Sequence, residues 1–278
     1  MSKIFVIGVG GTGIKTLIHV KKALTDPEKS GRLPEDVRLL GIDTCLKAEK
    51  VEDIGLWGGA FSRNGSKTDV ELDNDEYIPL TGDMRDWVKG TNAVTTQLHY
   101  RWFDRRYFSH PANNALLNVT AGAGMYRQIG RLAFYNNVSG QNSPLYAAIK
   151  RNLEELAGGG GELNVLVCGS LAGGTGAGIF ADVGSLVRKI FDAEIGTSGA
   201  ALQLHGLFAL PNAFKGTGAV STRVNEMKPR AFAAMLEIER FLVMSNISGG
   251  SLAQYIPETN DAVLSGRLGN GAVIYVML

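Results

Sequence analysis

The sequence predicts an α/β fold in which a parallel sheet is covered by helices on both faces. Three observations predict it: short apolar runs alternate with segments of helical periodicity, glycine-rich loops follow several of these runs, and the length suits one large α/β domain. Of the 278 residues, 45% are hydrophobic and 20% are charged, so the chain can bury a full core.

The first part of the chain supplies a strand, a helix and a second strand. The apolar runs Ile4–Ile7 and Val37–Ile42 predict two buried strands. Between them, Gly13–Leu24 is predicted to be helical, because its apolar residues recur at helical spacing. These residues are Ile14, Leu17, Ile18 and Val20.

The middle of the chain continues the alternation after residue 118. Residues 126–137 and 144–157 show helical periodicity, and the glycines of 158–161 end the second helix. The apolar run Asn164–Cys168 predicts a strand, and Gly178–Phe191 predicts the helix that follows it.

The last part predicts strand, helix and strand. Leu202–Leu210 is a strand ended by Pro211, and Pro229–Met244 is a helix with proline in its first turn, where helices tolerate it. Ala272–Leu278 predicts the final strand. Because domains seldom end on a buried strand, we expect the sequence to be a fragment of a longer protein.

Residues 46–118 do not follow this alternation. They contain the three tryptophans, many charges and several turn signals, and we interpret them as an insertion with short helices such as 95–107. The whole chain, 1–278, is otherwise predicted to form one domain.

Composition excludes several classes of protein. The net charge is +1, from 28 basic and 27 acidic residues, so no global field indicates a nucleic-acid or anionic-membrane binder. No apolar run approaches the roughly 18 residues of a membrane span, and the first glycine comes too early for a signal peptide. Two lone cysteines, Cys45 and Cys168, suit a reducing compartment, so we expect a cytoplasmic protein.

Glycine is the outlier of the composition, with 36 residues against a usual share of about 7%. The first glycine loop, Gly8–Gly13, follows a strand, opens a helix and has the G-x-G-x-x-G spacing. Glycine permits positive φ and close backbone approach, and a helix N-terminus offers N–H groups to a phosphate. The candidate contacts are Gly10, Gly11 and Thr12. The alternative is tight packing of the strand on the helix.

The second strand ends at Asp43, which allows three interpretations. Its carboxylate could bind a ribose hydroxyl, as in dinucleotide-binding folds. It could also hold a magnesium-bound water beside phosphates, or cap a helix N-terminus.

A second glycine-rich loop, Gly169–Gly178, again follows a strand and opens a helix. Two such loops indicate a polyphosphate held from two sides by backbone N–H groups, with added hydroxyl donors. The candidate contacts here are Ser170, Ala172, Gly173, Gly174, Thr175 and Gly176.

A third loop lies between them in the sequence and precedes a helix with Arg127 and Arg131. It could close on the terminal phosphate, or it could be an ordinary turn. Its candidate contacts are Ala121, Gly122, Ala123, Gly124 and Arg127.

These motifs resemble those of a known family. GGTGAG at 173–178 resembles the signature loop of tubulins and of the bacterial division protein FtsZ, and GVGGTG and IDT (42–44) resemble the family's first two phosphate loops. AGAGMYRQIGRLAF at 121–134 is similar to the loop and helix near the γ-phosphate, and LFALPNAF at 207–214, with Pro211, to the turn near the ribose. The overall likeness is to the bacterial tubulin-like group; it covers 3–45, 119–192 and 201–245, and leaves 46–118 as a family-specific insertion.

The resemblance implies a Rossmann-like domain that binds GTP or GDP with Mg²⁺. It also implies a cytoskeletal protein that assembles head-to-tail into filaments with the nucleotide between subunits, and GTPase activity completed in trans by acids of the next subunit. The family's C-terminal domain and those acids are absent from this chain, and Cys45 stands where the family often has an acid. We therefore assign no catalytic residue and no metal ligand.

Two other functions remain open at this point. GVGGTG and Asp43 would also fit a Rossmann-fold oxidoreductase that uses NAD, although such an enzyme needs only one glycine phosphate loop. A nucleotide-binding structural domain without turnover is the other alternative.

Overall fold

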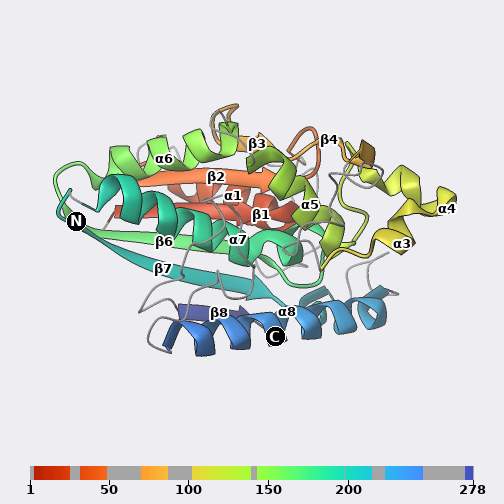
Figure 1. Cartoon of the computed structure of the whole chain (residues 1–278). Helices are drawn as coiled ribbons and strands as arrows, with labels where there is room; N and C mark the ends of the chain where they lie inside the picture. Colours follow the sequence, from red (N-terminus) through yellow and green to blue (C-terminus); the bar gives the residue numbers. More distant parts are fainter. Residues whose placement is uncertain are drawn as a thin grey trace, which may run out of the picture.

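Six strands form a parallel sheet in the order β3-β2-β1-β6-β7-β8 (Figure 1). The computed structural model describes residues 3–25, 32–48, 70–86, 102–138, 143–196, 198–214, 223–246 and 273–277. The strands of this sheet are β1 (Lys3–Val9), β2 (Val37–Asp43), β3 (Tyr77–Pro79), β6 (Gly161–Ser170), β7 (Ala200–Ala209) and β8 (Val273–Met277). Every pairing in it is parallel.

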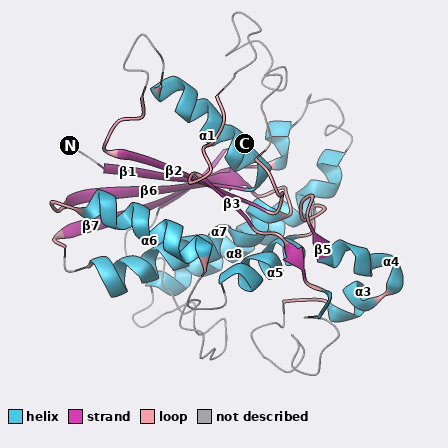
Figure 2. Cartoon of the chain, turned by 90° about the horizontal axis from the view of Figure 1, so that it is seen from above, coloured by secondary structure: helices cyan, strands magenta, loops and turns pink. Residues whose placement is uncertain are grey.

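Helices cover both faces of the sheet. From β1 the chain passes through α1 (Gly10–Leu24) to β2, and from β6 through α7 (Thr175–Ile190) to β7, on the opposite side of the sheet order. Right-handed crossovers in opposite directions place their helices on opposite faces. Figure 2 shows α1 on one face and α6 (Pro144–Ala157) with α7 on the other. The predicted fold class is therefore confirmed.

The core is divided between the two faces. On the α1 face, Leu17 packs with Val6 and Leu39 in a small cluster. The larger cluster lies on the other face, where β1 residues such as Phe5 pack with α5 (Arg127–Val138), α6 and α7. Alternate β1 residues thus point to opposite faces, and both are buried, as expected of a parallel sheet between helices.

For α8 (Val224–Asn246), the structure corrects one expectation. Pro229 was expected in its first turn, but the helix starts at Val224 and Pro229 lies inside it. Proline there leaves the carbonyl of Asn225 without its usual intrahelical donor. Asn225 is exposed, so water can bond to that carbonyl, and the helix can start one turn earlier than the proline suggests.

Part of the predicted insertion, 46–118, belongs to the sheet. β3 pairs with β2, and β4 (Gly82–Asp83) forms a short antiparallel pair with β5 (Asn118–Val119). Of the expected helix 95–107, residues 95–101 lie outside the described residues, and α3 begins at Arg105 and ends at Ser109. α3 and α4 (Pro111–Asn114) lie beyond the end of the sheet where α5 is found (Figure 1).

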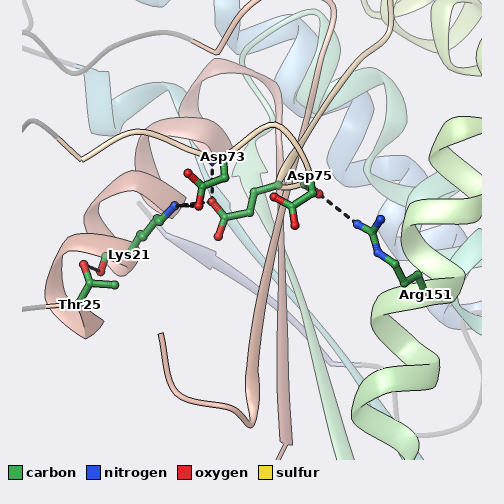
Figure 3. Close-up of polar contacts among 6 residues, drawn as sticks. Lys21, Thr25, Asp73, Asp75 and Arg151 are labelled. Carbon is green, nitrogen blue, oxygen red and sulfur yellow. Dashed lines mark hydrogen bonds and ion pairs between the residues drawn. The ribbon is translucent and has the colours of Figure 1, made fainter. Parts of the chain in front are cut away.

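An ion-pair cluster fastens the segment before β3 to the rest of the domain (Figure 3). Nζ of Lys21, in the last turn of α1, lies 2.8 Å from Oδ2 of Asp73 and 2.6 Å from Oε2 of Glu76. Lys21 and Glu76 are buried. Arg151 of α6 donates from Nη2 to the carbonyl of Asp75 at 3.4 Å. Helices on both faces of the sheet therefore hold this segment.

We predict that Lys21→Ala lowers the free energy of unfolding by about 3 kcal/mol, because it leaves the buried Glu76 carboxylate without its cation. Lys22→Ala, at the next position of the same helix, should change it by less than about 0.5 kcal/mol. Urea unfolding followed by circular dichroism measures both. Equal unfolding midpoints for the two variants would show that the buried pair does not fasten the segment.

Candidate functional site

The two glycine-rich loops that follow β1 and β6 lie side by side. β1 and β6 are neighbours, and their register pairs Val9 with Gly169. From this point the chain leaves in opposite directions along the sheet. Such a switch point, outside the carboxyl ends of parallel strands, is where open α/β sheets bind ligands.

The backbones at the starts of α1 and α7 lie very close together. A Cβ added to Gly10 would lie 2.7 Å from the amide nitrogen of Gly176, and one added to Gly176 would lie 2.8 Å from the carbonyl oxygen of Val9. Gly10 also has φ +70, which favours glycine. The glycine pattern thus brings two helix N-termini to one place.

Both of these helix N-termini lack a side-chain cap. The residues at the N-cap positions, Val9 and Gly174, make no side-chain capping bond, and neither helix has an acidic residue in its first turn. The first N–H groups of a helix have no intrahelical partner and carry the positive end of its dipole. Two such ends side by side favour an anion.

The predicted contacts of the first loop lie inside the helix. α1 begins at Gly10, so Gly10, Gly11 and Thr12 form its first turn, three residues earlier than the predicted start at Gly13. Gly11 and Thr12 are half-buried. Their amides therefore belong to the uncapped end of α1.

The two adjacent glycines of the signature loop face different surroundings. A Cβ added to Gly173 would meet no atom within 4 Å. One added to Gly174 would lie 2.9 Å from Cβ of Ala123 and 3.0 Å from Met125. Gly174 has φ −81, so close approach by the third loop, and not a positive φ, requires glycine there.

Ser170 and Ala172 form the loop's own hydrogen bonds. Oγ of Ser170 donates to the carbonyl of Ala209 at 3.3 Å and accepts from the amide of Ala172 at 3.0 Å. The amide of Leu171 also donates to Ala209, at 3.1 Å. Pro211 is buried and begins a short 3₁₀ helix just beyond this contact. These bonds tie the signature loop to the end of β7.

The third loop, 120–125, contacts both the loop that follows β2 (residues 43–46, called the second loop below) and the loop 169–178 that contains GGTGAG (the signature loop). Gly122 and Gly124 have φ +104 and +56, and Met125 has φ +66, a strained conformation for a residue with a side chain. The third loop pairs with the residues that follow β2. Cys45 and Ala121 form an isolated antiparallel β-bridge, and the amide of Gly122 donates to the carbonyl of Thr44 at 3.2 Å. An ordinary turn would require none of these contacts.

The second loop continues from Asp43, which is buried at the end of β2. Its Oδ1 accepts the amide of Thr44 at 2.7 Å, and Oγ1 of Thr44 lies 2.5 Å from Oγ1 of Thr175. No helix begins in residues 44–48, which argues against the helix-cap interpretation of Asp43. The second loop therefore touches the first residue of α7 through buried hydroxyls.

The two arginines of α5 contact other helices. Arg127 donates from Nε to the carbonyl of Ala177 at 2.9 Å and pairs with Glu237 of α8. Arg131 is buried, and its Nη2 lies 2.9 Å from Oδ1 of Asp182. Burial alone would lower the pKa of Arg131, but Asp182 overcomes this and raises it, so the guanidinium stays charged. Arg131 thus joins α5 to α7. Arg127, the arginine that was expected to contact a phosphate, is bonded to α7 and α8 in this structure.

Metal ligation can be tested on the same residues. The described part of the chain holds no group of three or more His, Cys, Asp or Glu side chains that could bind a metal. Mg²⁺ commonly needs only one or two carboxylates beside substrate phosphates, and Asp43 directly precedes Thr44, whose hydroxyl contacts Thr175 at the start of α7. The residues fit a magnesium ion held chiefly by a nucleotide.

Sequence reasoning missed two residues of this arrangement. Thr44, which joins the second loop to α7, lies within the IDT motif, so the motif itself was the available signal. Met125 gives no signal in the sequence, because its backbone conformation depends on the packing of Gly174 against the loop.

The family model described as "Tubulin like" matches residues 5–267. The chain belongs to the tubulin-like family. The match includes 46–118, which the sequence motifs had left uncovered. No curated protein matches the chain.

Two solved structures are similar to this chain. CetZ1 from Haloferax volcanii, a GDP-bound monomer, is 15% identical with a TM-score of 0.42 over 84% of this chain and 48% of its own. CetZ from Methanosaeta thermophila is 14% identical with a TM-score of 0.40 over 86% and 43%. This tubulin-like chain thus spans about half the length of those proteins. None of its described helices is long and apolar enough to cross a membrane.

The two cysteines provide a probe of this site. Burial raises the pKa of Cys168 to about 12, whereas Cys45, beside the third loop, is partly exposed. We predict that a maleimide labels Cys45 much faster than Cys168 in the native protein, and that saturating GTP slows the labelling of Cys45. Mass spectrometry of the labelled peptides measures both rates. Labelling of Cys45 that GTP leaves unchanged would place the nucleotide elsewhere.

Proposed function

We propose that this tubulin-like chain binds GTP or GDP at the junction of β1 and β6. The observation that carries the proposal is the pair of uncapped helix N-termini, α1 and α7, held together by backbone contact. A nucleotide's phosphates would supply the negative charge that no side chain of the two first turns supplies.

Each loop has a distinct task in this proposal. The first turn of α1, with Gly10, Gly11 and Thr12, holds one side of the phosphates. The signature loop holds the other through the backbone of Gly173, Gly174, Thr175 and Gly176. Loop 121–124 would close over the phosphates. The Asp43 carboxylate would bind a magnesium-bound water or a ribose hydroxyl. Bound Mg²⁺ would neutralise phosphate charge.

We further propose nucleotide-dependent self-association into head-to-tail filaments, with hydrolysis completed by a neighbouring subunit. Family membership supports this for the protein as a whole. Within the assigned site Asp43 is the only acidic residue, and its Oδ1 already accepts the amide of Thr44. The site can thus position phosphates, but the assigned residues include no evident base for an attacking water. A structural role without turnover would share the same binding site.

The oxidoreductase alternative has less support. A dinucleotide fold uses one glycine loop for its pyrophosphate, whereas here two helix N-termini and a third loop meet at one place. The tubulin-like family match also favours a guanine nucleotide over NAD.

Gly173→Val tests the phosphate site without disturbing the packing. The added side chain would enter space that is open in this structure, so the fold should persist, while GTP affinity should fall about tenfold or more, through the loss of at least one charge-assisted bond. Gly158→Val is the matched control, because its Cβ would also meet no atom closer than 3.6 Å, and because Gly158 lies beside Lys3 at the opposite end of the strands.

Calorimetric titration of both variants and the wild type with GTP, and with NAD in parallel, gives the dissociation constants. Wild-type GTP affinity in Gly173→Val would exclude this loop as the phosphate site. Tight binding of NAD with no binding of GTP would instead support the oxidoreductase.

The chain should bind GTP yet hydrolyse it slowly. A catalytic group supplied in trans can be worth about 10³–10⁵ in rate, and the assigned residues contain no such group. Phosphate release measured against protein concentration tests this. Release that is rapid and proportional to protein concentration would show a complete active site within one chain and would contradict the trans mechanism.

A further inference from the structure

Tyr77 of β3 reaches the second loop of the candidate site. Its hydroxyl donates to the carbonyl of Cys45 at 2.6 Å. We propose that Tyr77 is a positioning residue, which fixes the backbone of 43–46 against the loops that hold the phosphates. The proposal rests on the proposed function and adds to it a residue from outside the glycine motifs.

The second loop lies between β3 and the third loop. On the β3 side, besides the Tyr77 bond, the amide of Leu80 donates to the carbonyl of Asp43 at 2.6 Å. On the inner side the amides of Gly122 and Leu46 form longer bonds of 3.2 Å, to Thr44 and Thr120 respectively. The second loop is thus held on both sides, and the two shorter bonds are those on the β3 side.

The aromatic ring of Tyr77 is itself held by rigid parts of the fold. It packs with Ile14 and Ile18 of α1. A Cβ added to Gly41 would lie 3.3 Å from Cδ2 of Tyr77, so glycine at 41 leaves room for the ring over β2. The hydroxyl position is therefore set by α1 and β2, which also begin and end at the candidate site.

The residue before Tyr77 is anchored independently. The carbonyl of Glu76 accepts the amide of Gly41 at 2.7 Å, and its carboxylate binds Lys21 in the buried cluster of Figure 3. Tyr77 consequently has a fixed backbone, a packed ring and a hydroxyl bonded to the loop. A residue that only filled the core would not need the last of these.

Tyr77→Phe tests the proposal, because it removes the hydroxyl and keeps the ring. Tyr146→Phe is the matched control: it removes a tyrosine hydroxyl bonded to Glu194, beyond the C-terminal end of α7 and so at the other end of that helix from Thr175. Urea unfolding of both variants checks that their global stabilities are comparable.

The first readout is hydrogen exchange of a peptide covering 42–46 in nucleotide-free protein. We expect exchange about fivefold faster in Tyr77→Phe, as for the loss of one hydrogen bond, and unchanged exchange in Tyr146→Phe. The second readout is the dissociation constant for GTP, which should rise about fivefold in Tyr77→Phe alone.

Exchange or affinity that stays at the wild-type value in Tyr77→Phe would overturn the proposal, as would equal changes in the two variants. If the wild-type protein bound no GTP, the proposed function would fall and, with it, the nucleotide role of Tyr77. The exchange measurement would then still decide whether Tyr77 holds the loop.

Discussion

The rest of the structure depends on a contact between two stretches of backbone, the first turns of α1 and α7. A Cβ added to Gly13 would lie 2.7 Å from the carbonyl oxygen of Cys168, and those added to Gly10 and Gly176 would meet the opposite turn equally closely. No side chain fits between the starts of α1 and α7. The two helices can therefore begin side by side after the neighbouring strands β1 and β6, and still cover opposite faces of the sheet. A larger residue at any of these positions would push the two helix starts apart, and with them every group assigned to the site.

The same contacts show why glycine content alone cannot identify a phosphate site. Within GGTGAG, Gly174, Gly176 and Gly178 each face a close neighbour, and the Cβ of Gly178 would lie 2.4 Å from the carbonyl oxygen of Arg127. These three are required by packing of α7 against α1, α5 and the third loop. Gly173 alone faces open space. A motif that suggests ligand binding therefore serves mostly to join helices, and only Gly173 leaves room for the proposed phosphate contact.

Much of the fold could be predicted from periodicity, whereas the contacts between distant segments could not. The helix 144–157 was predicted with the bounds that α6 has, because proline and glycine mark its ends. The start of α1 was placed three residues late, since glycine disfavours helix interiors and Gly10, Gly11 and Gly13 all fall within the first turn. β3 was missed because Tyr77–Pro79 is short and contains proline, which is tolerated at a sheet edge. The ion-pair partner of Arg131, Asp182, lies on α7, so no local pattern could reveal that this arginine is buried.

The contact between the two helix N-termini also has an electrostatic consequence, because both ends are positive. Each carries roughly half a positive charge, and here two like ends lie together with no acidic residue in either first turn. The folded chain therefore holds a local repulsion that its own first turns do not offset. An anion placed between the two ends would convert this repulsion into two attractions and would bind the folded state alone, so its binding would add to stability by mass action. The packing that makes the glycines necessary is thus the same packing that would make a bound anion favourable, so binding of the proposed ligand would add to the stability of this tubulin-like domain.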